Sequence, residues 1–187
     1  MARWEPNARG RLEEAALELF GERGFEQTAV ADIAERAGLT ERTYFRHFAD
    51  KREVLFWGEH LLSETLVGAI GDAPESASAL EMVRAGLAAV TAIFVERQDH
   101  ARRRQAVIDA NPGLQERELA KLAALASATA EALRARGVVE PAASLAAQAG
   151  IAVFKVAFRQ WISASDGVDL ADLIDAAFVE LKAVTAI

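Results

Sequence analysis

The 187-residue sequence contains no cysteine and only four prolines. Without cysteine the chain has no disulfide, no thiol nucleophile and no Cys-ligated metal site. Rare proline together with abundant alanine and leucine favours helix, and no strand pattern or internal repeat is visible. Hydrophobic residues make up 52% of the chain, which permits a sizeable core and argues against disorder. The sequence therefore predicts an all-α fold.

Long apolar runs and enzyme motifs are also missing. The most apolar stretch, residues 142–158, is interrupted by Gln148 and Lys155 and falls short of a membrane span, so we expect a soluble, cytoplasmic protein with no membrane partner. No phosphate-binding glycine loop or His-Glu-x-x-His motif occurs. His60 and Glu64 together supply only two metal ligands. We therefore expect no catalytic residue, metal or cofactor, although a helical enzyme stays an alternative.

The net charge of −7 is unevenly distributed along the chain. Residues 36–52 contain five Arg and Lys but only two Asp and Glu, whereas the chain from Glu53 onward contains 12 basic and 18 acidic residues. A local basic cluster in an acidic protein is the electrostatic footprint of a DNA-binding element. This distribution indicates nucleic-acid contact near residues 36–52.

Apolar periodicity predicts three short helices at the N-terminus. Residues 9–21 carry apolar side chains at the i, i+3, i+4 and i+7 spacing of an amphipathic helix. The second helix is expected to follow a Thr28 cap and to stop at Gly38, and the third to run over residues 41–48 after a Thr40 cap. Two short helices joined by a glycine turn are typical of a helix-turn-helix, although generic helical hairpins share this pattern.

The remaining sequence predicts six further helices, about nine in total. They are expected over residues 50–70, 77–97, 100–110, 114–136, 141–164 and 170–185. We place the domain boundary after residue 52. Residues 1–52 then form a three-helix helix-turn-helix DNA-binding domain, and residues 53–187 form a helical ligand-binding and dimerisation domain.

The helix expected over residues 141–164 is apolar on two opposite faces. One face can pack against its own domain and the other against the same helix of a second chain. The last helix offers a similar seam, which predicts a four-helix homodimer interface. The alternative is that both faces belong to the core of one chain. The predicted interface residues are Leu145, Ala149, Ala152, Val156, Leu170, Ile174, Ala177 and Leu181.

Large aromatic side chains recur on the helices of the second domain. Ligand pockets between helices are mostly apolar with a few polar anchors. Aromatic residues at helical spacing also occur in an ordinary packed core, which stays the alternative interpretation. The candidate ligand-binding residues are Trp57, His60, Leu61, Phe94, Phe154, Phe158 and Trp161.

Residues 24–55, GFEQTAVADIAERAGLTERTYFRHFADKREVL, closely resemble the DNA-binding domain of TetR-type regulators. The shared features include a Gly-aromatic pair before a Thr, an Ala-Gly-Leu-Thr turn and an aromatic cluster ending in Phe48. The resemblance implies a repressor that binds a palindromic operator as a homodimer and is released by a small apolar or amphiphilic effector. The DNA contacts that it implies are Thr40 at the helix N-terminus, Arg42 and Thr43 toward the bases, and Thr28, His47 and Lys51 toward the phosphates, with Phe45 as a further DNA-binding residue.

Two positions depart from this family pattern. Phe45 stands where the family often has Tyr, so a phosphate hydrogen bond from that ring is lost. Tyr44 occupies an inward position that is usually aliphatic, and its hydroxyl therefore needs a hydrogen-bond partner.

A second segment, residues 102–133, resembles the C-terminal region of a TetR subgroup that binds acyl-CoA-like ligands and lies near regulators of mycofactocin systems. The shared features are an Arg-Arg before an apolar pair, an Asn-Pro-x-Leu break and an Arg-Glu-Leu-Ala-Lys string. The resemblance implies an acyl-CoA-like amphiphile as effector, with Arg103 available for its phosphate groups. A solvated basic helix face is the alternative for these arginines, and a ligand-free scaffold dimer is the remaining alternative function.

Overall fold

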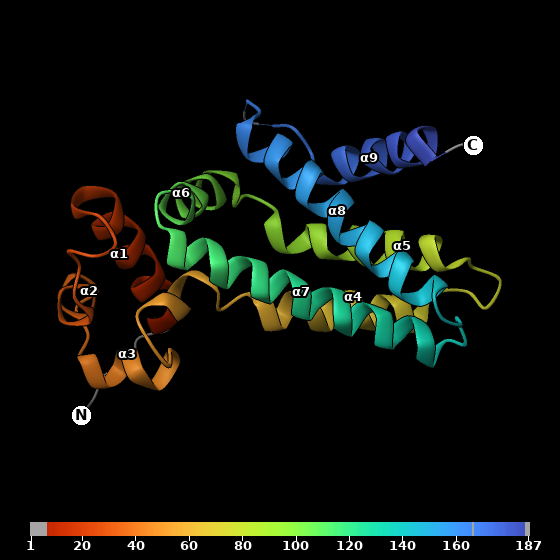
Figure 1. Cartoon of the computed structure of the whole chain (residues 1–187). Helices are drawn as coiled ribbons and strands as arrows, with labels where there is room; N and C mark the ends of the chain where they lie inside the picture. Colours follow the sequence, from red (N-terminus) through yellow and green to blue (C-terminus); the bar gives the residue numbers. More distant parts are fainter. Residues whose placement is uncertain (1–6, 166, 186–187) are drawn as a thin grey trace. The chain divides into compact units, whose positions relative to one another are not determined.

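The computed structural model describes residues 7–165 and 167–185, which form nine α-helices and two short 3-10 helices without any strand (Figure 1). The all-α prediction is confirmed for these residues. Contacts divide the chain into two compact units, with residues 1–57 and 103–118 in unit 1 and residues 58–102 and 119–187 in unit 2. The boundary after residue 52 stays a prediction, and the structure adds a second chain segment to the first unit.

Unit 1 combines the N-terminal helices with the end of one later helix and the start of the next. Its core contains apolar side chains from both segments, including Leu12, Ile33 and Tyr44 from the first and Ile108 and Leu114 from the second. Its elements are α1 (Ala8–Arg23), α2 (Val30–Arg36), α3 (Glu41–His47), the 3-10 helix η1 (Arg52–Leu55), the last part of α6 (Gln98–Asp109) and the first part of α7 (Pro112–Ala135).

Polar caps set where α2 and α3 begin. The Thr40 hydroxyl accepts a hydrogen bond from the Thr43 N–H at 3.2 Å, so α3 has its predicted cap. At α2 the Asp32 carboxylate accepts the Ala29 N–H at 2.9 Å. Thr28, predicted to cap this helix, lies one residue before the cap position and has a different role described below.

The turn between α2 and α3 depends on Gly38, which has a φ of 64°. This left-handed conformation lets the Leu39 N–H donate to the Ala34 carbonyl at 2.8 Å and closes the end of α2. Arg11 of α1 donates to the neighbouring Ala37 carbonyl. The tight glycine turn predicted from the sequence is therefore present, and the Arg11 side chain of α1 stabilises it.

Unit 2 is a separate helical bundle. Within it α5 packs against α4, α8 and α9, and α8 packs against α9. The close approach of α8 to α5 requires Gly150, because a Cβ there would lie 2.2 Å from Val83 Cγ1. Its elements are α4 (Glu59–Asp72), α5 (Ala79–Thr91), η2 (Ala92–Phe94), the remaining parts of α6 and α7, α8 (Ala142–Ser163) and α9 (Leu170–Thr185).

The helix predicted over residues 50–70 is broken in two. The Asp50 carboxylate accepts the N–H groups of Arg52 at 2.8 Å and Glu53 at 3.0 Å and thereby starts the short η1. The second piece, α4, starts after Gly58. The sequence periodicity continues through this break, which is why a single helix was expected.

The helix predicted over residues 77–97 is shorter than expected. It starts with a capping box between Ser78 and Glu81, in which the Ser78 N–H donates to the Glu81 carboxylate at 2.8 Å. The α-helix ends at Thr91, passes into η2 and turns at Glu96, whose φ is 59°.

One helix in the described part of the chain, α8, is long and apolar enough to cross a membrane by length and composition alone. Of its most apolar window, 44% is buried inside the structure. A core helix of a bundle meets the same two criteria, and α8 contributes Ile151, Phe154 and Trp161 to the core of unit 2.

Replacing Gly38 by alanine should lower the free energy of unfolding by about 1–2 kcal/mol, because an L side chain is strained at this φ. The added Cβ would also lie 2.8 Å from Nη2 of Arg11. The matched control is Gly21→Ala in α1, where nothing lies within 4 Å of the new methyl group. This change should stabilise the helix by about 0.5–1 kcal/mol. Urea unfolding followed by circular dichroism measures both changes, and equal stabilities would contradict the assignment.

Candidate nucleic-acid interface

The third helix, α3, has one buried and one exposed face. Tyr44 and Phe48 point into the core of unit 1 and are 0% and 2% exposed. Arg42, Phe45 and Arg46, spaced at i, i+3 and i+4, share the opposite exposed face. The burial of the two aromatic rings therefore decides which side chains α3 presents to solvent.

A shallow hollow lies on this exposed face. It is lined by Arg42, Thr43, Phe45 and Arg46. Two guanidinium groups can bind guanine edges or phosphates, and the threonine methyl and phenyl ring can contact a thymine methyl. The combination is suited to the major groove of DNA. Arg46 was not among the predicted contacts. Its i+4 spacing from Arg42 indicates that the two side chains share one face of the helix, and this spacing could have identified it.

Tyr44 joins α3 to the segment that follows it. Its hydroxyl lies 3.3 Å from the Asp50 carbonyl and 3.2 Å from the Lys51 carbonyl, to which it donates. Burial raises the pKa of the Tyr44 hydroxyl, and the charges of Asp50 and Glu53 raise it further, so the group stays a protonated donor. This contact supplies the partner that the sequence left open.

The structure gives Thr28 a structural role instead of the predicted DNA contact. The side chain is 1% exposed, and its hydroxyl donates to the Gly24 carbonyl at 2.9 Å. A buried hydroxyl that is already hydrogen-bonded cannot reach a phosphate without rearrangement. Thr28 therefore holds the loop between α1 and α2.

Lys51 is likewise engaged inside unit 1. Its ammonium group donates to the Phe25 carbonyl at 2.8 Å and the Thr28 carbonyl at 3.1 Å, and it lies 4.2 Å from the centre of the Phe25 ring. All of these contacts hold the positive charge against the backbone of the loop before α2. We therefore assign Lys51 to the support of α2 rather than to a phosphate.

His47 lies at the end of α3 and is half-buried. Burial lowers the pKa of its imidazole, and the nearby charges of Arg46 and Arg9 lower it further. Its Nε2 atom is buried and has no hydrogen-bond partner among the described residues. At neutral pH the ring is therefore neutral, and its phosphate contact stays a prediction.

Four of the candidate ligand residues form one aromatic cluster in unit 2. Phe94 of η2 lies with its ring centre 6.2 Å from that of Phe154, 5.5 Å from that of Phe158 and 5.8 Å from that of Trp161. The Trp161 indole N–H donates to the Val168 carbonyl at 3.0 Å. In this structure the four rings pack on one another. This arrangement agrees with the alternative interpretation of the sequence, in which the aromatic residues form an ordinary packed core.

Two family models match this chain. Residues 12–56 match the model for bacterial regulatory proteins of the tetR family. Residues 77–186, more than half of the chain, match the model for the MftR C-terminal domain. The chain belongs to the TetR family.

Curated relatives support this assignment over part of their length. The TetR-type chain is 37% identical over 82 residues to the transcriptional regulator TcmR of Streptomyces glaucescens, an alignment that covers 44% of this chain and 36% of TcmR. It is 33% identical over 107 residues to MftR of Mycobacterium tuberculosis, a regulator named for mycofactocin biosynthesis, with 56% and 52% covered. The aligned part thus spans about half of these relatives or less.

A solved structure extends the similarity to nearly the whole chain. FadR of Thermus thermophilus, a TetR-family transcriptional repressor in complex with lauroyl-CoA, superposes with a TM-score of 0.56 at 23% identity. The match covers 96% of this chain and 95% of that one, and at this identity it shows the fold alone. TetR regulators bind operator DNA as dimers and respond to small molecules, and they are not enzymes.

Three further candidate ligand residues of this TetR-type chain lie outside the aromatic cluster. Trp57 belongs to unit 1, where the Arg9 guanidinium lies 5.2 Å from its ring centre. The His60 side chain is 84% exposed and lies 3.3 Å from the Glu64 carboxylate. Leu61 is also exposed. None of the three is part of the cluster: Trp57 precedes α4 and packs against the core of unit 1, and α4 exposes His60 and Leu61.

Arg103 has a partner other than a ligand phosphate. Its guanidinium forms an ion pair with the Glu14 carboxylate of α1 at 2.7 Å, within unit 1. The neighbouring Arg104 donates to the Leu55 carbonyl at 2.6 Å and pairs with Glu118 at 3.1 Å. Arg103 is therefore engaged by Glu14 within unit 1, and its contact with a ligand phosphate stays a prediction.

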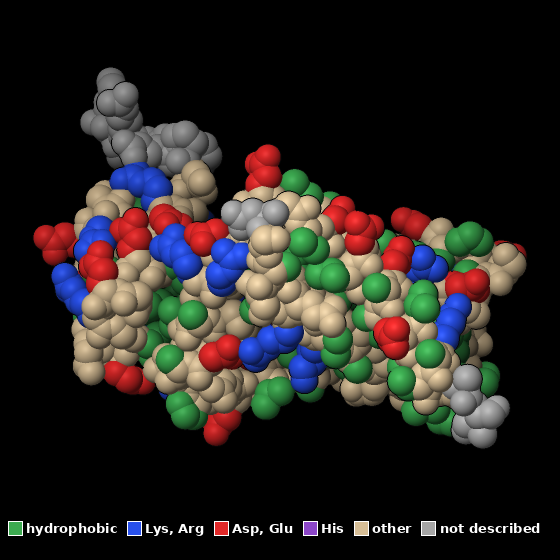
Figure 2. All heavy atoms as spheres, turned by 90° about the horizontal axis from the view of Figure 1, so that it is seen from above, with side chains coloured by type: hydrophobic (Ala, Val, Ile, Leu, Met, Phe, Trp, Pro, Cys, Tyr) green, Lys and Arg blue, Asp and Glu red, His purple; other side chains and the backbone are tan. Residues whose placement is uncertain are grey.

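The outer face of α8 carries the predicted interface residues of that helix. Leu145 is 66% exposed, Val156 is 53% exposed, Ala152 is exposed and Ala149 is half-buried. Figure 2, which views the side of α8 and α9, shows hydrophobic side chains spread among charged ones over these helices. Leu145, Ala152 and Val156 are therefore exposed, and their place in a dimer interface stays a prediction.

The α9 residues are arranged differently from the prediction. Leu170 and Ile174 are 3% and 1% exposed in the core of unit 2, and Ala177 and Leu181 are partly buried against that core. The apolar side chains that α9 exposes include Val179 and Val184. We therefore assign Leu170 and Ile174 to the intradomain core, because α9 uses that stripe to pack against α5 and α8.

The described residues contain no group of three or more His, Asp or Glu side chains that could hold a metal ion. His60 and Glu64 form an exposed pair that would supply only two metal ligands. The candidate sites of this TetR-type protein are therefore the exposed face of α3 in unit 1 and the aromatic cluster in unit 2.

Proposed function

We propose that this protein is a repressor that binds a near-palindromic operator through the exposed face of α3 and releases it when an acyl-CoA-like effector binds in unit 2. The observation that carries the DNA-binding part is the cluster of Arg42, Thr43, Phe45 and Arg46 on the face opposite the buried Tyr44. A genomic operator as target implies a cytoplasmic protein.

Arg42 is the side chain best suited to read a base in this proposal. It is exposed on the first turn of α3, and no ion pair of its guanidinium is seen among the described residues. By contrast, Arg36 of α2 pairs with Glu18 at 3.0 Å and with Glu22 at 2.9 Å. An unpaired arginine beside a threonine methyl can bind guanine through both guanidinium donors.

Arg42→Ala should weaken operator binding by about 1–3 kcal/mol and relax the preference at one base pair. The operator is first obtained by selecting duplexes from a randomised library with the purified protein. Fluorescence anisotropy on the selected site and on its single-base variants then measures both effects. Arg23→Ala, which removes an exposed charge at the end of α1, is the matched control and should change neither. Unchanged base preference in the Arg42 variant would contradict the role of α3.

Dimerisation is proposed through the exposed faces of α8 and α9. The support is the row of Leu145, Ala152 and Val156 on α8 together with Val179 and Val184 on α9. A two-fold axis through such a surface pairs each helix with its own copy. Two copies of α3 would then lie about 34–36 Å apart, or a multiple of that distance, on a near-palindromic site.

Ala152→Arg should convert the dimer to a monomer, because an arginine buried between apolar helices loses its hydration without gaining a partner. Sedimentation velocity measures the state of the folded variant at several concentrations. The control Ala124→Arg introduces the same charge at an exposed position of α7 and should leave the dimer intact. A folded Ala152→Arg dimer would remove α8 from the interface.

The effector is proposed to be an acyl-CoA whose apolar chain separates the rings of the aromatic cluster. The support is the density of aromatic side chains between η2 and α8 and the lauroyl-CoA bound by the FadR structure. Rings packed on one another must move apart to admit a chain. Only a ligand that binds the DNA-incompetent state more tightly can release the operator, and a tenfold loss requires about 1.4 kcal/mol of coupling.

Titrating lauroyl-CoA, palmitoyl-CoA or free coenzyme A into the operator complex tests this proposal. The two acyl-CoAs should lower operator affinity and free coenzyme A should not. Phe158→Ala should weaken this response while leaving operator affinity without effector unchanged, and Leu119→Ala, at an exposed position of α7, is the control. If neither acyl-CoA displaces the operator, the effector class is wrong, and the DNA-binding proposal is unaffected.

A further inference from the structure

The segment 103–118 is packed into the core of the helix-turn-helix unit. Ile108 and Leu114 are 0% and 1% exposed, and with Val107 they belong to the same apolar cluster as the side chains of α1, α3 and η1. Residues 58–102, which belong to unit 2, separate this segment from the N-terminal part of unit 1 in the sequence. The core beneath α3 is therefore built from two distant pieces of the chain.

Charged side chains of the same segment extend this contact. Arg104 donates to the Leu55 carbonyl at the end of η1, lies 5.1 Å from the centre of the Phe56 ring and pairs with Glu118. Gln105 donates to the Glu118 carboxylate at 3.1 Å. Arg104 and Glu118, which lie in the two motifs noted in the sequence, thus hold the start of α7 against η1.

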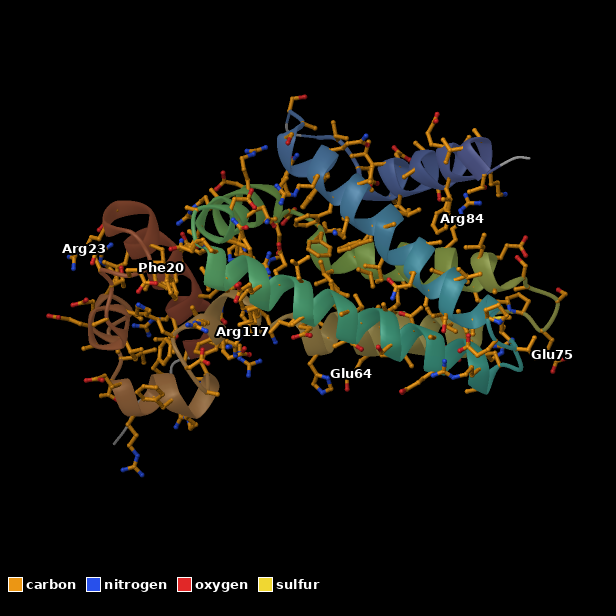
Figure 3. The ribbon with its side chains drawn as sticks, in the orientation of Figure 1. Phe20, Arg23, Glu64, Glu75, Arg84 and Arg117 are labelled. Carbon is orange, nitrogen blue, oxygen red and sulfur yellow. The ribbon has the colours of Figure 1, made fainter. Side chains whose placement is uncertain are left out.

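Arg117 contacts the segment that follows α3. Its Nη2 lies 3.2 Å from the Asp50 carboxylate, and its Nε donates to the Glu53 carboxylate at 2.9 Å. Figure 3 shows Arg117 near the start of α7, on the side facing η1. One guanidinium therefore bridges two carboxylates that flank the start of η1.

Asp50 connects this bridge to α3. Its carboxylate caps η1 through the N–H groups of Arg52 and Glu53, while its backbone carbonyl accepts the hydroxyl of Tyr44. Tyr44 is fully buried and fixes which face of α3 is exposed. The chain of contacts thus runs from Arg117 through Asp50 to Tyr44, entirely within unit 1.

We propose that Arg117 is a positioning residue for the DNA-binding helix, acting through Asp50 and Tyr44 without touching DNA. This inference rests on the proposed DNA-binding function. It assigns the arginines of residues 103–118 to the architecture of the DNA-binding unit, and it makes that unit a composite of two chain segments.

The single tyrosine of the chain provides a direct readout of this relay. Incorporation of 3-fluorotyrosine gives one ¹⁹F resonance, which reports on the surroundings of Tyr44. Arg117→Gln should shift or broaden this resonance and weaken operator binding by about tenfold, which is about 1.4 kcal/mol. The salt dependence of binding should not change, because Arg117 neutralises no phosphate.

Two further variants complete the experiment. Arg117→Lys keeps the charge but lacks the planar fork, so its affinity and resonance should lie between those of the wild type and the Gln variant. Arg134→Gln removes a comparable ion pair, with Glu140 at 2.7 Å in unit 2, and should change neither readout. Far-UV circular dichroism establishes that each variant is folded. If Arg117→Gln does not fold, the same readouts on Arg117→Lys decide the question.

Three results would overturn the proposal. The first is a folded variant with wild-type operator affinity, and the second is reduced affinity with an unchanged fluorotyrosine resonance. The third is a fall of the salt slope by about one unit, which would indicate direct phosphate contact. If the wild-type protein binds no operator at all, the proposed function fails, whereas the ¹⁹F comparison still tests the relay from Arg117 to Tyr44.

Discussion

The burial of Tyr44 is the constraint on which the proposed DNA-binding surface of this protein depends. A seven-residue helix such as α3 is too short to be stable by itself, so its orientation comes from packing. Tyr44 and Phe48 supply that packing, and the Tyr44 hydroxyl joins the helix to the backbone at Asp50 and Lys51. With these rings inside, Arg42 and Arg46 point outward.

The basic residues of unit 1 divide into two groups with different roles. Lys51, Arg103 and Arg104 are engaged with backbone carbonyls, aromatic rings or carboxylates of the unit itself. Arg42 and Arg46 line the exposed hollow on α3. Partly buried charges cost free energy unless they are paired, so the first group is committed to holding the unit together. Counting the basic residues in the sequence therefore gives more positive charges than unit 1 leaves available for DNA.

In unit 2 the helix α8 combines two environments. Its inner face contributes Phe154 and Trp161 to the aromatic cluster, and its outer face exposes Leu145 and Val156. A substitution on one face leaves the other in place, which allows ligand response and assembly to be examined separately. The stripe of α9 with Leu170 and Ile174 is used for packing against α5 and α8, so its contribution to an interface comes from other side chains.

Local sequence determined the helix-turn-helix and most helix ends. Periodicity, the Thr40 cap and Gly38 act over a few residues, and the family motif over residues 24–55 is contiguous, so the fold class, the family and the outward position of Arg42 followed without the structure. Only the tertiary structure decided the partners of Thr28, Lys51, Arg103 and Arg117. Their roles depend on which carbonyl or carboxylate lies within about 3 Å, as for hydrogen bonds in general. For Lys51, Arg103 and Arg117 that group is distant in sequence. The same limit applied to α9, where periodicity identified an apolar stripe but not whether it would meet the chain's own core or a second chain.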